Sequence, residues 1–101
     1  MAIVQFSRRA ESDLLNISKY TLDTWGAAQA DHYLSEIEAC CNRLAVTPML
    51  GRSCDEVSAG LRRMEQGKHV VFYLEQRKGI WISRVLHQSM LPERHEMDDG
   101  V

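Results

Sequence analysis

Three β-prone runs lie close together in the last third of the chain, between Gly60 and His95. They cover residues 61–65, 69–75 and 80–87, and the middle run contains HVVFYL, the most β-prone segment of the sequence. The dipeptide QG at 66–67 separates the first two runs, and QRKG at 76–79 separates the last two. Connections this short join antiparallel neighbours. The sequence therefore predicts an antiparallel three-stranded meander around which the rest of the chain is organised.

The last of these strands, residues 80–87, lacks a purely apolar face. An arginine in phase with two isoleucines predicts a β-bulge, or a strand whose exposed face has a function. Arg84 also needs a partner if it lies among buried positions, which makes it the first candidate for a functional side chain. Strict alternation places Ile80, Ile82, Arg84 and Leu86 on one face, and Trp81, Ser83, Val85 and His87 on the other.

Two amphipathic helices are predicted upstream of the meander. Ser7 ends a short β-prone segment, residues 2–7, and is placed to cap a helix over residues 9–25, which Gly26 can end. The second helix, residues 27–45, has the clearest period, and Pro48 disfavours helix in the residue before it. The apolar positions are Ala10, Leu14, Ile17 and Leu22 in the first helix, and Ala30, Leu34, Ile37, Cys41 and Leu44 in the second.

The order of these elements defines an α+β fold, β-α-α-β-β-β, in a single domain over residues 1–101. Only one or two residues separate the helices, so they should form an antiparallel hairpin whose apolar stripes face the same core. We expect this hairpin to pack on one face of a small antiparallel sheet and to leave the other face free. Residues 49–59 are rich in turn-forming residues and are expected to form a loop.

Composition excludes several classes of protein. An apolar fraction of 45% with 26% charged residues is that of an ordinary globular domain. No apolar run is long enough to span a membrane, and the N-terminal apolar stretch is too short for a signal peptide, which predicts a cytoplasmic protein. Cys40, Cys41 and Cys54 lack metal-ligand spacing and are expected to be reduced core residues. Neither a cofactor nor a metal is predicted.

The net charge of −2 argues against a dedicated nucleic-acid binder. Residues 60–95 nevertheless carry seven Lys/Arg against three acids, so a basic face could meet an acidic partner or a phosphate backbone, or could simply be solvated. Neither a glycine-rich phosphate loop nor a GxSxG motif is present. The remaining cluster could bind phosphate and act as general acid or base, or form an interaction surface without chemistry. It consists of Arg62, Arg63, Lys68, His69, Arg84, His87, Arg94 and His95.

The strand pair LRRMEQGKHVVFY and the ending ISRVLHQSMLPERH resemble the toxins of the RelE/ParE superfamily of bacterial toxin–antitoxin modules. The resemblance runs from Ile3 to about His95. The RVLH ending of the last strand is common to the superfamily, whereas QSMLPERH points to its ParE branch. The order of elements expected above is also that of the superfamily.

Similarity to the ParE branch implies a protein that arrests growth by binding DNA gyrase, and so an inhibitor rather than an enzyme. The end of the last strand and the tail would then contact the target. The resemblance does not distinguish gyrase from the related topoisomerase IV. The target-binding residues would be Arg84, His87, Met90, Leu91, Arg94 and His95.

Similarity to the RelE branch implies an alternative function, ribosome-dependent cleavage of mRNA. Arg62, Arg84, His87 and His95 would then be the catalytic residues. RelE-like members also use a tyrosine or histidine near the C-terminus, and this sequence has no tyrosine after Tyr73. The ribonuclease is therefore the second of the two hypotheses.

The family resemblance also implies a ParD-like antitoxin, which would form a hetero-oligomer with the toxin. The C-terminal segment of such an antitoxin orders as it wraps the toxin. Trp25 and Tyr33 are candidates for the groove that receives this segment. Neither sequence-specific binding of nucleic acid nor association with a membrane is expected.

Overall fold

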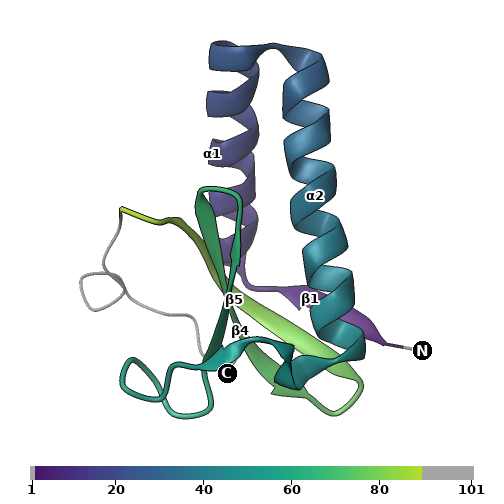
Figure 1. Ribbon diagram of the computed structural model, residues 1–101, viewed down its shortest axis with the longest axis vertical. Helices are drawn as coiled ribbons and strands as arrows, with labels where there is room; N and C mark the ends of the chain where they lie inside the picture. Colours follow the sequence, from purple (N-terminus) through teal and green to yellow (C-terminus); the bar gives the residue numbers. More distant parts are fainter. Residues whose placement is uncertain (1, 90–101) are drawn as a thin grey trace.

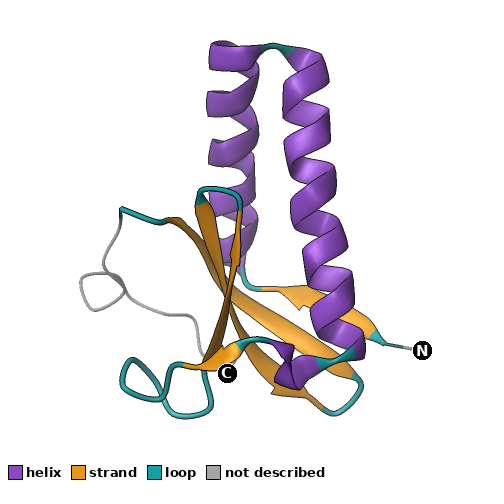
Figure 2. Ribbon diagram, viewed as in Figure 1, coloured by secondary structure: helices purple, strands orange, loops and turns teal. Residues whose placement is uncertain are grey.

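A five-stranded sheet carries a hairpin of two helices in the computed structural model, which describes residues 2–89 (Figures 1 and 2). The strands lie in the order β1-β5-β4-β3-β2. The hairpin extends beyond the sheet at the end where the two helices are joined (Figure 1). The elements are β1 (Ile3–Phe6), α1 (Arg8–Trp25), α2 (Ala27–Val46), a 3-10 helix η1 (Pro48–Leu50), β2 (Arg52–Ser53), β3 (Arg62–Gln66), β4 (His69–Gln76) and β5 (Gly79–His87).

The predicted α+β class, the helical hairpin and the antiparallel meander β3-β4-β5 are confirmed. The sheet as a whole is mixed, however, because β1 pairs in parallel with β5, from Ile3 opposite Gly79 to Phe6 opposite Ile82. Short turns force an antiparallel arrangement on β3, β4 and β5. β1 is joined to the sheet through two helices, so no turn dictates its direction.

Caps and packing place the two helices. The Ser7 hydroxyl accepts a hydrogen bond from the Ala10 amide at 2.9 Å, and the Gly26 amide donates to the Leu22 carbonyl at 3.0 Å. Leu22 itself is 49% exposed, and Thr21, four residues after Ile17, takes the buried position instead. The main core contains Ile17, Ile37, Cys40, Cys41, Leu44, Val71, Tyr73, Ile80, Ile82 and Val85.

The sheet face opposite the helices is covered in part, which corrects the expectation that it is free. Residues 54–61 fold over it, and the Cys54 amide donates to the Leu61 carbonyl at 2.7 Å. The segment predicted as a loop thus contains the short strand β2 and contributes to a second core. This core consists of Cys54, Leu61, Val70, Phe72 and Leu86, with Val57 and Leu74 packed against it. All three cysteines are buried and free, as expected for core residues.

The predicted β-bulge lies in β5. Phe72 pairs with Arg84 and Tyr73 pairs with Ile82, so Ser83 is an extra residue. The extra residue reverses the alternation that follows it. Val85 joins Ile82 in the core beneath the helices, while Leu86 joins the opposite core. Strict alternation was therefore wrong for the end of the strand.

None of the helices in the described part of the chain is long and apolar enough to cross a membrane.

Gly79→Ala is expected to lower the free energy of unfolding by at least about 2 kcal/mol. A Cβ atom at this position would overlap the carbonyl oxygen of Ile3, so β1 would have to move away from β5. Gly26→Ala is the matched control, because Gly26 also has a positive φ but no atom lies within 4 Å of its Cβ position. The control should cost less than Gly79→Ala, about 1 to 2 kcal/mol, because it has the strain of the backbone at φ 92° and ψ 171° without the clash. Equal losses in urea unfolding would contradict the role given to the β1–β5 contact.

Candidate functional site

The guanidinium of Arg84 is bound by a carboxylate of the same chain. Its Nε donates to Asp13 Oδ2 at 2.8 Å, and its Nη2 donates to Asp13 Oδ1 at 2.9 Å. The two side chains are only 15% and 12% exposed. Such a bidentate ion pair is strong and geometrically specific. The partner that the sequence required for Arg84 therefore lies on α1.

Backbone atoms at the bulge are held by the same segment of the chain. Asp13 Oδ2 also accepts a hydrogen bond from the Val85 amide at 3.0 Å. The Ser7 hydroxyl donates to the Ser83 carbonyl at 2.7 Å. β1 ends opposite Ile82, so these two side chains bind β5 beyond the point where β1 stops. The start of α1 thus fixes the direction in which the end of β5 runs.

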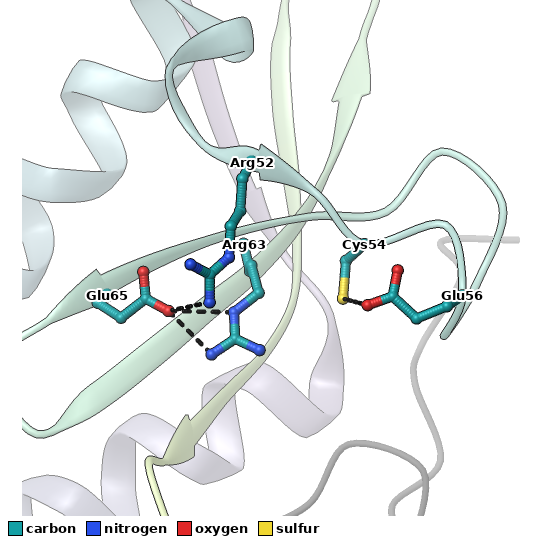
Figure 3. A network of polar contacts seen from close by, with 5 residues as sticks. All are labelled: Arg52, Cys54, Glu56, Arg63 and Glu65. Carbon is teal, nitrogen blue, oxygen red and sulfur yellow. Dashed lines mark hydrogen bonds and ion pairs between the residues drawn. The ribbon is translucent and has the colours of Figure 1, made fainter.

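Arg63 and Glu65 form a more exposed ion pair on β3 (Figure 3). Glu65 Oε2 accepts from Arg63 Nη2 at 2.8 Å and from Arg52 Nη2 at 3.1 Å. Partial burial raises the pKa of Glu65, but hydrogen bonds and the positive charges of Arg63 and Arg52 outweigh it, and the net direction is downward. Because Glu65 is 49% exposed, water screens this pair far more than the pair of Asp13.

Two histidines face each other at the ends of β4 and β5. His69 and His87 are directly paired, and their ring centroids lie 5.3 Å apart with an interplanar angle of 87°. Tyr33 of α2 contacts His69, with its hydroxyl 2.5 Å from Nδ1. Through these two contacts, His69 connects Tyr33 of α2 with His87 at the end of β5.

A hydrogen bond fixes which nitrogen of the neutral His87 ring carries the proton. The Ser89 amide donates to His87 Nδ1 at 3.1 Å, so Nδ1 accepts and the hydrogen lies on Nε2. The Tyr33 hydroxyl accepts from the Lys68 amide at 3.1 Å, and its contact with His69 Nδ1 fits either tautomer of that ring. A protonated His69 carries N–H groups on both nitrogens.

Two adjoining hollows lie between α1 and this histidine pair, with Tyr20, His69 and His87 lining both. We call them together the histidine cleft. The part of about 470 Å³ is lined by Tyr20, Thr21, Trp25, Gln29, Tyr33, Gly67, Lys68, His69 and His87. The part of about 400 Å³ is lined by Asp13, Asn16, Ile17, Tyr20, His69, Val85, Leu86, His87 and Ser89.

A hollow of about 770 Å³ lies elsewhere, between the β4–β5 turn and the end of α2. None of the residues predicted to contact a target lines it.

Only some of the residues predicted from the sequence line the histidine cleft. His87 lines it together with Trp25 and Tyr33, which the sequence had assigned to a different partner. Tyr20 was not predicted, and His69 was predicted only as one member of a basic cluster. The register that pairs His69 with His87 depends on the bulge at Ser83, and the residue pattern does not identify which residue of the strand is the extra one.

Arg62 lies away from the histidine cleft, at the other end of β3. Its Nε donates to the Gly51 carbonyl at 3.0 Å, and its neighbour across the sheet is Tyr73. The described members of the ribonuclease hypothesis, Arg62, Arg84 and His87, are therefore not brought together. Met90, Leu91, Arg94 and His95 lie outside the described residues.

Asp13→Asn is expected to lower the free energy of unfolding by about 3 kcal/mol, because it leaves the mostly buried charge of Arg84 without its ionic partner. Glu65→Gln is the matched control, since it removes a carboxylate that also binds arginine but is half exposed. The control should cost less than about 1 kcal/mol. Chemical denaturation of both variants measures the difference, and similar losses would refute the special weight given to Asp13.

Burial lowers the pKa of His69 below its ordinary value of 6.5, and the nearby His87 lowers it further, while Asp13 acts in the opposite direction. Folded His69 thus resists a proton that the unfolded chain accepts. The stability that neutral His69 contributes is fully present above its pKa in the unfolded chain. It is lost as the pH falls towards its lower pKa in the folded protein.

The free energy of unfolding should therefore decrease as the pH falls below about 6.5. His69→Gln is expected to remove this dependence on pH. Urea unfolding of the parent chain and of the variant over a range of pH measures the difference. His32→Gln serves as the control because His32 is an exposed residue of α2. A His69→Gln profile that runs parallel to that of the parent chain would contradict the assignment.

Comparison with known proteins agrees with the fold and with the resemblance in the sequence. Residues 4–92 match the family model described as ParE toxin of type II toxin-antitoxin system, parDE. The chain is 40% identical over 90 residues to Toxin ParE1 of Mycobacterium tuberculosis, which covers 88% of this chain and 92% of the relative. It is 41% identical over 93 residues to Toxin ParE1 of Caulobacter vibrioides, covering 90% and 94%.

A solved structure shares the architecture. It is a chain of the chromosomal ParDE TA system from P. aeruginosa, with a TM-score of 0.71 and 21% identity over 86% of this chain and 96% of that one. At this identity the likeness concerns the fold alone. The family model and the two curated relatives extend over most of the sequence. The chain therefore belongs to the ParE family of toxins of type II toxin–antitoxin systems.

Proposed function

We propose that this toxin inhibits DNA gyrase by binding it, and that a ParD-like antitoxin neutralises it. The single observation that carries the proposal is the position of His87 at the anchored end of β5, beside the histidine cleft. The target contact is made by this strand end together with the residues that follow it. No covalent step is involved, because the inhibitor acts by occupying a surface of its target.

The geometry of the strand end supports docking. Asp13 and Ser7 bind the backbone on both sides of Arg84, so the last residues of β5 are fixed before any partner arrives. A surface that is already ordered loses little conformational entropy on binding. Arg84 contributes by holding this direction through Asp13. His87, Met90, Leu91, Arg94 and His95 make the target contacts in this proposal.

The ribonuclease hypothesis receives no comparable support. General acid–base catalysis requires its groups to converge on one reacting bond. Arg62 is bound to the carbonyls of Gly51 and Met49, and Arg84 is bound to Asp13. Arg62 and Arg84 are therefore each bound within the fold, to groups on different elements.

The antitoxin is proposed to bind on the helical side of the molecule. Tyr20 and Trp25 of α1 are each 67% exposed, and Leu22 between them is 49% exposed. An exposed apolar surface of this kind is typical of a site for another protein. Tyr33 contributes from α2, through the histidine cleft. The structural relative, a chain of a ParDE TA system, also supports an antitoxin partner.

A supercoiling assay with purified gyrase tests the target. The parent chain is expected to inhibit supercoiling, and His87→Ala should need at least about tenfold more protein, as expected when one central contact of an interface is removed. A chain that ends at Ser89 should also lose inhibition, because it lacks the four proposed contacts beyond that residue. His32→Ala, on the exposed face of α2, is the control and should behave like the parent.

Normal supercoiling in a stoichiometric excess of folded protein would reject gyrase as the target. The same preparations are added to a translation extract and mRNA is examined by primer extension. Cleavage that depends on His87 would favour the ribonuclease over the proposal.

A further inference from the structure

We propose that the histidine cleft is a docking site for an acidic segment of the antitoxin, and that His69 and His87 together bind one carboxylate of that segment. The inference rests on the proposed function only for the identity of the partner. The chemistry of the site comes from the residues that line the cleft.

The cleft presents hydrogen-bond donors from the two histidines that line both of its parts. The Nδ1 of His87 accepts from the Ser89 amide, so its neutral ring offers an Nε2–H group, and a protonated His69 offers one as well. Pairing across β4 and β5 brings the two rings to 5.3 Å, which places both donors within one small region. Two imidazole rings this close, both lining the cleft, suit the two oxygens of one carboxylate.

The charges around the cleft favour an anion. Among the described residues, no aspartate or glutamate lines the larger part of the cleft, whereas Lys68 does. Asp13 lines the smaller part, but its oxygens already accept from Arg84 and from the Val85 amide. A carboxylate that entered the cleft would therefore meet donors and one lysine.

Aromatic walls extend the site along α1. Tyr20 and Trp25 line the same hollow as the histidines and expose two thirds of their surface. Aromatic rings with a polar edge are frequent anchors at protein interfaces. The segment that fits this surface carries an apolar side chain next to its acidic residue. Docking of such a segment buries the rings while the carboxylate reaches the histidines.

A peptide fits these observations better than a nucleic acid. A phosphate backbone is bound by a series of cations that follow the strand. The larger part of the cleft has one lysine, and the chain has a net charge of −2. One carboxylate needs only the donors that are present. The partner is therefore a protein segment with isolated acidic residues.

Binding of this kind depends on pH. The groups that face the histidine pair are Asp13 and Tyr20 of α1, Tyr33 of α2, Lys68 of the β3–β4 turn, and Arg84, which is bound to Asp13. Among these groups, Asp13 alone carries a carboxylate. Protonation of either imidazole replaces a neutral donor with a charged one, which strengthens its bond to a carboxylate. The segment should therefore bind more tightly at lower pH.

Selection from a random dodecapeptide library displayed on phage, with the full chain immobilised, provides the probe. Selected peptides should be enriched in aspartate or glutamate beside an aromatic or aliphatic residue. The best peptide is then synthesised with blocked ends and titrated by calorimetry. Its affinity should be about threefold or more higher at pH 6 than at pH 8. Replacing its acidic residue with the corresponding amide should weaken binding at least about tenfold.

Variants of the chain locate the site. His87→Gln and His69→Gln should each reduce binding of the peptide and flatten its pH dependence, while His32→Gln should leave both unchanged. The amide peptide is titrated against the parent chain. It therefore tests the proposal even if a histidine variant fails to fold. Selection without acidic enrichment, equal binding of the amide peptide, or tighter binding of a single-stranded dodecanucleotide would overturn the proposal.

The peptide titration does not depend on gyrase. Carboxylate-dependent binding together with normal supercoiling would retain the docking site and reject the proposed target. Inhibition of gyrase without any acidic peptide binding at the histidines would retain the target and reject the docking site.

Discussion

The contact between Asp13 and the bulge of β5 is the interaction on which the position of the end of β5 depends. One carboxylate neutralises Arg84 and also accepts the Val85 amide, which lies beyond the end of β1. A strand edge that exposes such groups is open to incorrect pairing. Here the first turns of α1 close the edge with side chains, and the end of β5 leaves the sheet in a defined direction.

Local chemistry made much of the fold predictable. Ser7, Gly26 and Pro48 mark the ends of the helices, and the period of the apolar side chains identifies the face that α2 buries. Turn residues at 66–67 and 76–79 imply the meander. The parallel pairing of β1 was not predictable in this way, since it arises from packing between segments distant in sequence. The covering of the second sheet face by residues 54–61 has the same origin.

The candidate site was predictable only as a set of residue types. An unusual arginine in an apolar strand indicated that Arg84 has a partner, but its choice of Asp13 depends on how α1 lies along β5. His87 was singled out, whereas its neighbours His69 and Tyr20 come from other elements and no short-range pattern connects them. Trp25 and Tyr33, assigned to a second partner, line the same cleft as His87. If both partners bind there, one excludes the other by occupying common surface.

The extra residue at the bulge has a consequence for sequence change in this chain. Side chains alternate along a strand. The face on which His87 lies therefore depends on whether the number of alternating residues between Ile82 and His87 is odd or even. With Ser83 bulged out, His87 is paired with His69 and lies on the side of the helices. Straightening the strand without losing a residue would send His87 to the opposite side. Insertions or deletions of one residue in this short interval would therefore redirect the strand end to another surface, while leaving the composition of the site nearly intact.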